Sequence, residues 1–166
     1  ITDLLMNNNM RWEATQVGNW SISASAFNIQ DTVTMTVHHG QAVTVLAVLD
    51  TSEQTAGGII NIVVTGTDSD GNTFPQLVEW TEDGIEVENI TAGSDDGTYA
   101  FKATIAGPHT LDYSTGIVSN SANISVDALY IVHSLSIELS SESIDQLGSF
   151  TVTVKAFDEY LNPISI

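Results

Sequence analysis

The stretch Gly97-Thr-Tyr-Ala-Phe-Lys-Ala-Thr-Ile-Ala-Gly-Pro-His-Thr-Leu-Asp-Tyr113 decides the fold of this chain. Apolar side chains recur in it at every second position, at Tyr99, Phe101, Ala103 and Ile105. A period of two is typical of a strand with one buried face. Gly107-Pro108 interrupts the run, and the alternation starts again at Leu111. The stretch therefore predicts a β-hairpin.

The same hairpin pattern occurs a second time near the start of the chain. The segment Met10–Ser25 aligns without a gap with Tyr99–Ser114, 89 residues later, and the strand pattern of 32–37 aligns with 121–126 at the same offset. After residue 126 the central pattern begins again, because 148–164 aligns with 58–74 at an offset of 90. An internal repeat of this length is the size of one sandwich domain rather than of a solenoid unit.

These patterns predict an all-β protein made of tandem immunoglobulin-like antiparallel β-sandwich repeats of about 90 residues. We expect residues 1–37 to be the C-terminal part of one repeat, 38–128 a complete sandwich, and 129–166 the N-terminal part of a further repeat. Inside the complete repeat, the polar and glycine-containing segment 51–58 is typical of a connection between strands.

Composition limits the classes of partner. Hydrophobic residues make up 42% of the 166 residues, which excludes a disordered tail, and no apolar run approaches the ~20 residues of a membrane span. The formal net charge is −18, because 21 acidic residues face three basic ones, Arg11, Lys102 and Lys155. Nucleic acid and anionic membrane surfaces are therefore excluded as partners. A saline medium that screens self-repulsion suits such a chain, and the absence of cysteine rules out a disulfide.

The turn Val63-Val-Thr-Gly-Thr-Asp-Ser-Asp-Gly-Asn72, repeated in 152–163, precedes an aromatic-bearing strand at 78–80 and the Gly-Thr-Tyr segment at 97–107. In this order the motifs resemble bacterial immunoglobulin-like repeats of the invasin and intimin type, and filamin repeats are similar in the same segment. The resemblance covers the central repeat and both partial ones. It implies tandem stalk domains of surface proteins that present an adhesive tip, with no catalytic residues.

Four oxygen-bearing side chains have the spacing of positions 1, 3, 5 and 12 of a calcium loop: Asp68, Asp70, Asn72 and Glu79. Calcium is thus a candidate ligand, although no cofactor is required. Against it, Thr73 stands where the loop needs glycine, and the next repeat has Tyr160 in place of the second aspartate. The alternative is that the first Asp and the Asn cap a tight turn, since the next repeat keeps both as Asp158 and Asn162.

Other candidate sites come from short motifs. Asn19, Asn89 and Asn123 begin Asn-X-Ser/Thr tripeptides and are candidate glycosylation acceptors. Trp20 aligns with the polar His109, so we expect it to be an exposed aromatic, whereas Trp12 and Trp80 fall on core positions. The sequence contains neither a nucleophile motif nor a histidine cluster with metal-ligand spacing, so nothing in it predicts an enzyme.

We therefore expect a non-enzymatic stalk or spacer segment of a longer, repetitive, adhesin-like protein at the cell surface or outside the cell. Its partners would be neighbouring immunoglobulin-like repeats or other copies of itself. One alternative is a self-assembling filament or surface-lattice subunit, in which the partial terminal repeats join by β-strand complementation. A second alternative is a carbohydrate-binding sandwich module of a secreted protein, with a glycan or a cell-surface receptor as the ligand.

Overall fold

The computed structural model describes residues 13–165, and this part of the chain contains strands and turns but no helix. It accordingly holds no long apolar helix that could cross a membrane. The strands are β1 (Gly18–Ala26), β2 (Ile29–Val37), β3 (Thr44–Leu49), β4 (Glu53–Thr55), β5 (Ile59–Thr67), β6 (Thr73–Pro75), β7 (Glu79–Glu82), β8 (Ile85–Glu86), β9 (Ile90–Ala92), β10 (Thr98–Lys102), β11 (Gly107–Ser114), β12 (Ser119–Asp127), β13 (Ser134–Leu139), β14 (Val152–Phe157) and β15 (Pro163–Ile164). The predicted all-β class is confirmed.

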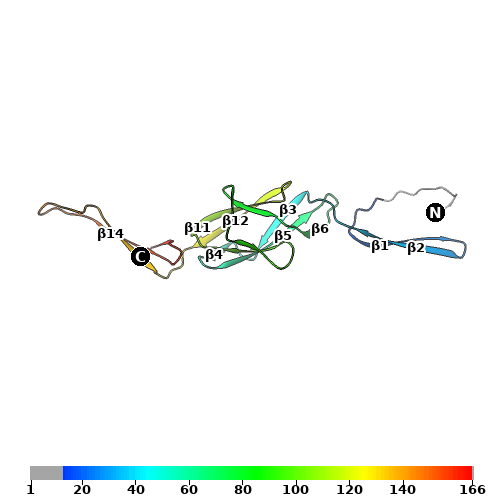
Figure 1. Ribbon diagram of the computed structural model, residues 1–166, viewed down its shortest axis with the longest axis horizontal. Coiled ribbons are helices and arrows are strands. Elements are labelled where there is room, and N and C mark those ends of the chain that lie inside the picture. Colours follow the sequence, from blue (N-terminus) through cyan, green and yellow to red (C-terminus); the bar gives the residue numbers. More distant parts are fainter. Residues whose placement is uncertain (1–12, 166) are drawn as a thin grey trace.

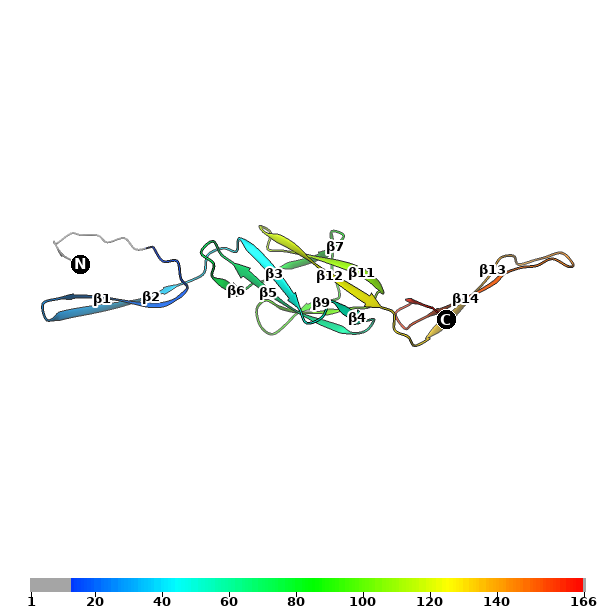
Figure 2. The ribbon, with the colours of Figure 1, turned by 180° about the vertical axis from the view of Figure 1, so that it is seen from behind.

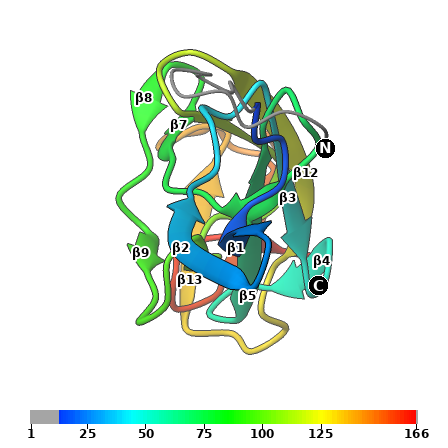
Figure 3. The ribbon, with the colours of Figure 1, turned by 90° about the vertical axis from the view of Figure 1, so that its right-hand side faces the viewer.

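The molecule is elongated, with three units in a row (Figure 1). Hairpin β1–β2 forms one end, a β-sandwich built from β3 to β12 lies in the middle, and β13 to β15 form the other end. The view from behind shows the same order (Figure 2), and the end-on view shows the hairpin in front of the sandwich (Figure 3).

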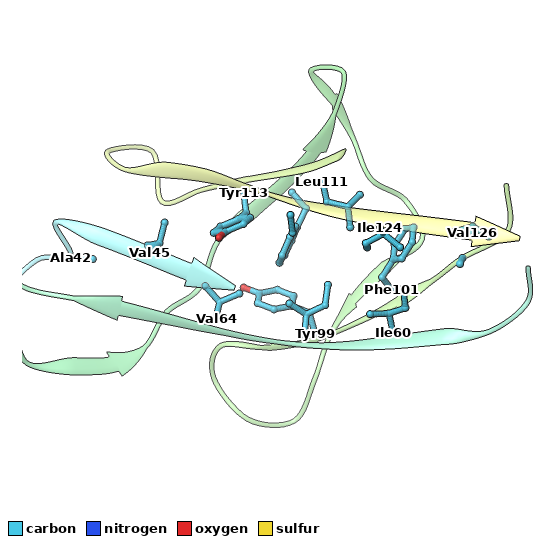
Figure 4. Packing of buried hydrophobic residues seen from close by; sticks show 14 of the residues in the cluster. Ala42, Val45, Ile60, Val64, Tyr99, Phe101, Leu111, Tyr113, Ile124 and Val126 are labelled. Atoms are coloured by element: carbon cyan, nitrogen blue, oxygen red, sulfur yellow. The ribbon is translucent and has the colours of Figure 1, made fainter. Parts of the chain in front are cut away.

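The central sandwich consists of two five-stranded sheets. One has the order β3-β5-β10-β9, with β6 paired to β5, and the other has the order β4-β12-β11-β7-β8. All pairs are antiparallel except β4 with β12. The two inner faces pack against each other (Figure 4). An immunoglobulin-like sandwich is therefore present, as the repeat length predicts.

Alternation along each strand builds the core. In β5, Ile60, Ile62 and Val64 point inward and are at most 1% exposed. Leu111 and Tyr113 of β11 lie opposite them across the sandwich (Figure 4). The wider core comprises Ala42, Val45, Ala56, Phe74, Trp80, Tyr99, Phe101, Ala103, Ala122, Ile124 and Val126. The predicted core position of Trp80 is thus confirmed.

The end units repeat the strand pairing of the sandwich. In β1–β2, Gly18 pairs with Val37, and 89 residues later Gly107 pairs with Val126 in β11–β12. In β13–β14, Leu135 pairs with Ala156, 90 residues after the pair formed by Val45 and Gly66 in β3–β5. The two end units are therefore counterparts of the two opposite halves of the sandwich. The domain boundaries at 37/38 and 128/129 stay a prediction.

Two local expectations are wrong. The segment predicted as a connection over 51–58 contains β4, which pairs in parallel with the end of β12. Ile105 is 64% exposed, because β10 already ends at Lys102 and the chain leaves the sheet there. Three residues named above lie outside the described residues. They are Met10, at which the first hairpin is predicted to begin, Arg11 and Trp12.

Candidate functional site at the repeat junctions

Two aspartates are buried at the junctions between consecutive units. Asp68 follows β5 and is 4% exposed, and Asp158 follows β14 and is 0% exposed. Burial of a carboxylate is costly unless its oxygens receive hydrogen bonds. The donors that surround these two side chains therefore matter for the structure of each junction.

The Asp68 carboxylate accepts hydrogen bonds from its own turn and from the linker. Oδ1 accepts the backbone N–H groups of Asp70 at 3.0 Å and Asn72 at 2.9 Å, and Oδ2 accepts the N–H of Gly40 at 2.9 Å. The Asn72 side-chain amide also donates to both oxygens, at 3.1 and 3.0 Å. The carboxylate thus joins the β5–β6 turn to the linker that enters the sandwich.

Asp158 has the same set of partners in the next unit. Its Oδ1 accepts the N–H groups of Tyr160 at 2.9 Å and Asn162 at 2.8 Å, and its Oδ2 accepts the N–H of Leu129 at 2.9 Å. The side-chain amide of Asn162 donates to Oδ2 at 2.9 Å. One arrangement of hydrogen bonds therefore occurs twice in the chain.

The asparagine of each pair also binds the preceding unit. Asn162 donates through Nδ2 to the carbonyl oxygen of Thr104 at 2.8 Å, and its Oδ1 accepts the N–H of Ala106 at 2.7 Å. Asn72 donates in the same way to the carbonyl of Thr15 at 3.0 Å and accepts the N–H of Val17 at 3.4 Å. We refer to each set, the buried Asp, the Asn and their backbone partners, as a clasp.

The two clasps occupy equivalent positions in the repeat, and a linker insertion lies outside them. Between Gly40 and the N–H of Val43, which binds Thr67, there are two residues. Between Leu129 and the N–H of His133, which binds Phe157, there are three. The extra residue therefore lengthens the linker after its clasp contact, so the clasp itself keeps its geometry.

The surroundings of the two clasps differ. At the second junction the Tyr160 ring lies against Gly57, where an added Cβ would come within 2.7 Å of the Tyr160 hydroxyl oxygen. Asp70 holds the position of this tyrosine at the first junction and is exposed. There, the linker residue His39 stacks on Phe74, with ring centroids 3.5 Å apart and planes 9° apart. Each junction thus adds its own aromatic contact to a shared hydrogen-bond pattern.

His109 braces the loop that carries the second clasp's partners. One ring nitrogen lies 2.7 Å from the Glu82 carboxylate and the other 2.7 Å from the carbonyl oxygen of Ile105. Ile105 stands between Thr104 and Ala106, whose backbone groups bind the asparagine. The histidine therefore links β11 and β7 to this loop.

The hydrogen bonds lower the pKa of both buried carboxyl groups. For Asp68 the donors, first the Asn72 side chain and then the Gly40 N–H, lower the pKa from 3.8 to about 2. At Asp158 burial raises the pKa, but the hydrogen bonds from Asn162, Leu129 and Tyr160 outweigh burial, and the net direction is downward. Both clasps therefore favour an ionised aspartate.

The four candidate calcium ligands do not form one cluster. Asp70 and Glu79 are exposed, and Glu79 begins β7 in the opposite sheet from the Asp68 turn. The Asp68 oxygens face N–H donors, whereas a cation needs their free lone pairs. Within residues 13–165 no group of three His, Asp or Glu side chains is arranged to hold a metal ion. This geometry fits the turn alternative, and the calcium assignment stays a prediction.

The other candidate residues lie on the surface. Asn19, Asn89 and Asn123 are exposed, and each forms a hydrogen bond with a threonine hydroxyl on a neighbouring strand or loop, those of Thr36, Thr104 and Thr110. Their glycosylation stays a prediction. Trp20 is 44% exposed and donates through Nε1 to the carbonyl of Gln16 at 3.1 Å. It lies on the same face of β1 as the half-buried Ile22.

Comparisons with known proteins give similarity in fold alone. No protein-family model and no curated protein matches the chain. Among solved structures, domains 1–6 of surface layer protein SbsC have a TM-score of 0.43 at 20% identity, and the match covers 89% of this chain and 20% of that one. InvD of Yersinia pseudotuberculosis has a TM-score of 0.44 at 15% identity, covering 89% and 52%. Murine CEACAM1b has a TM-score of 0.35 at 12% identity, covering 68% and 59%. The chain thus spans less than two thirds of each of these proteins.

We predict that Asn162→Ala loosens the second junction. The Ala106 N–H and the Thr104 carbonyl would lose their partner, at a cost of about 1–2 kcal/mol, so the Ala106 amide should exchange with solvent about 5- to 30-fold faster. Hydrogen exchange measured by NMR tests this. Asn123→Ala, on the exposed face of β12, is the matched control and should leave the Ala106 rate unchanged. An Ala106 rate that Asn162→Ala leaves unaltered would show that the contact is not formed in solution.

We predict that the first clasp weakens only in strong acid. Since the folded pKa of Asp68 lies below its ordinary value, its ionised form stabilises the folded state above about pH 4, and this contribution is lost as the pH falls towards 2. The Gly40 amide proton, which binds this carboxylate, should report a titration with a midpoint near 2 by NMR. Asp68→Asn should abolish it. A midpoint near 4 would mean that the carboxylate is solvated rather than clasped.

Proposed function

We propose that this chain is a non-enzymatic spacer segment of an extracellular or cell-surface protein, and that it holds consecutive immunoglobulin-like units in a row. The observation that carries the proposal is the occurrence of one clasp at two successive junctions. A flexible connection between domains does not need the same buried Asp and Asn at every junction. A connection that fixes the angle between domains does need such repeated contacts.

The clasp opposes bending because it fixes each unit at two separate points. The aspartate binds the linker backbone at Leu129, and the asparagine binds the loop of the preceding unit at Thr104 and Ala106. Rotation about the linker would break the second contact while the first is kept. The spacer would therefore keep the two ends of the row at a fixed distance and orientation relative to each other.

Surface chemistry supports a location outside the cell. The outward positions of β11 and β12 are mostly Ser, Thr and Asn, and the whole chain has three basic residues against 21 acidic ones. Such a surface has little attraction for nucleic acid or anionic lipid, and salt screens its self-repulsion. The partners proposed for it are neighbouring repeats, and no cofactor is needed for this role.

We predict a narrow range of distances across the second junction. The chain has no cysteine, so spin labels can be placed at introduced Ser121→Cys on β12 and Thr153→Cys on β14 without other changes. Pulsed electron spin resonance should give one narrow distance distribution, which Asn162→Ala broadens and Asn123→Ala does not. An equally broad distribution in all three proteins would mean a flexible tether and would contradict the spacer proposal.

A further inference from the structure

The ring of His109 is held between two hydrogen-bond acceptors. Its Nδ1 lies 2.7 Å from Oε1 of Glu82, and its Nε2 lies 2.7 Å from the carbonyl oxygen of Ile105. An ionised carboxylate and a carbonyl oxygen can only accept, so both ring nitrogens must donate if both contacts are hydrogen bonds. A neutral imidazole has one N–H group, and the imidazolium has two. The geometry around His109 therefore requires the protonated ring.

The charged groups around this ring are acidic. Four carboxylates line the same pocket as the ring: Glu82, Asp83, Glu86 and Glu88. From the other elements packed on His109, β10 contributes the Phe101 ring, with ring centroids 6.3 Å apart, and β12 contributes Ile124, its partner in the strand register. Both lie at the same end of the core (Figure 4). Opposite charges attract, so the carboxylates and a positive ring stabilise each other.

The first junction makes the equivalent contact with a side chain that does not titrate. Trp20 occupies in β1 the position that His109 has in β11. Its Nε1–H donates at 3.1 Å to the carbonyl oxygen of Gln16, the counterpart of Ile105. An indole N–H is always a donor. The same loop carbonyl is therefore bound at both junctions, at the first by a permanent donor and at the second by a donor that depends on protonation.

This carbonyl belongs to the loop that the second clasp uses. Ile105 lies between Thr104 and Ala106, whose backbone groups bind Asn162. When the ring loses its proton, the one remaining N–H goes to the stronger, charged acceptor, Glu82. The Nε2 lone pair then faces the carbonyl oxygen of Ile105, 2.7 Å away. Because two lone pairs repel each other, the loop must move away from the ring.

We propose that His109 makes the second junction sensitive to pH. Its imidazolium form holds the loop beside the second clasp. Loss of the proton, as the pH rises through the range of about 5 to 8 in which histidine titrates, releases this loop. The first junction, with Trp20 in the same place, is insensitive to that change. The consequence for the angle between units rests on the proposed spacer function, whereas the change in the loop itself does not.

Glu82→Gln distinguishes this proposal from a purely structural role of the histidine. The glutamine amide can donate to Nδ1, so a neutral ring can carry its proton on Nε2 and keep the Ile105 contact. This variant should therefore hold the loop over the whole pH range. The matched control, Glu86→Gln, removes the same charge from the same pocket and leaves Glu82 in place. His133, the other histidine at this junction, is exposed and is present in every variant.

The test is NMR spectroscopy of the 166-residue chain between about pH 5 and pH 8. Nitrogen-15 spectra of His109 give the number of ring N–H groups. The protection factor of the Ala106 amide, its intrinsic exchange rate divided by its measured rate at the same pH, reports opening of the loop. In the wild type, two ring N–H groups should be present at the acid end and only Nδ1–H at the alkaline end. Over the same range the Ala106 protection factor should fall about 3- to 10-fold, as expected for one lost hydrogen bond.

The variants should separate clearly. Glu82→Gln should keep the Ala106 protection factor at the acid-end value of the wild type throughout, and Glu86→Gln should show the wild-type fall. A constant protection factor in the wild type, a single ring N–H group at both ends of the range, or a protection factor that still falls or is low throughout in Glu82→Gln would each overturn the proposal.

The spin-label pair across the second junction shows whether the spacer function fails instead. A distance distribution that is narrow at the acid end and broader at the alkaline end supports both proposals. A broad distribution at every pH would contradict the spacer function, while the ring and Ala106 measurements would still decide whether His109 holds the loop.

Discussion

The structure depends on a buried carboxylate whose charge is balanced by N–H donors rather than by a basic residue. Asp68 and Asp158 each collect donors from a turn, from a linker and from an asparagine side chain. Because the donors come from separate segments, removing the carboxylate would leave several buried N–H groups without acceptors at once. The contacts that the carboxylate makes with the turn, the linker and the asparagine therefore form and break together. In a chain with only three basic residues, backbone donors are the available means of holding a buried acid.

This constraint explains how weakly packed end units keep a defined place. Hairpin β1–β2 and strands β13 to β15 bury little apolar surface of their own. Most of their side chains whose counterparts point into the core of the sandwich are exposed here. Their position relative to the sandwich comes instead from directed hydrogen bonds made by Asn72 and Asn162. Hydrogen bonds are directional, so they fix the angle between two units as well as their distance.

Much of the fold could be predicted from sequence because it is local and repeated. Alternation located the long strands, and the offset of 89 to 90 residues placed β1–β2 and β13–β14 on their counterparts. The short β4 was missed because three polar residues carry no alternation. Ile105 was misplaced because the alternation continues past the end of β10, where the loop turns to meet Asn162.

The site was half predictable for a related reason. The sequence indicated that Asp68 and Asn72 cap a turn, but not that the asparagine reaches Thr15, 57 residues away. Both asparagines bind main-chain groups, the carbonyl oxygens of Thr15 and Thr104, which every residue has. No side-chain pattern in the sequence therefore indicated this contact.

The central claim is that the clasp makes the sandwich and the following unit one rigid body. Residual dipolar couplings of the backbone amides in β3 to β12 and in β13–β14, measured at neutral pH on monomeric protein, test it most directly. The account predicts that a single alignment tensor fits both sets of couplings. Two tensors of different size and orientation would show that the units reorient independently, and would contradict it.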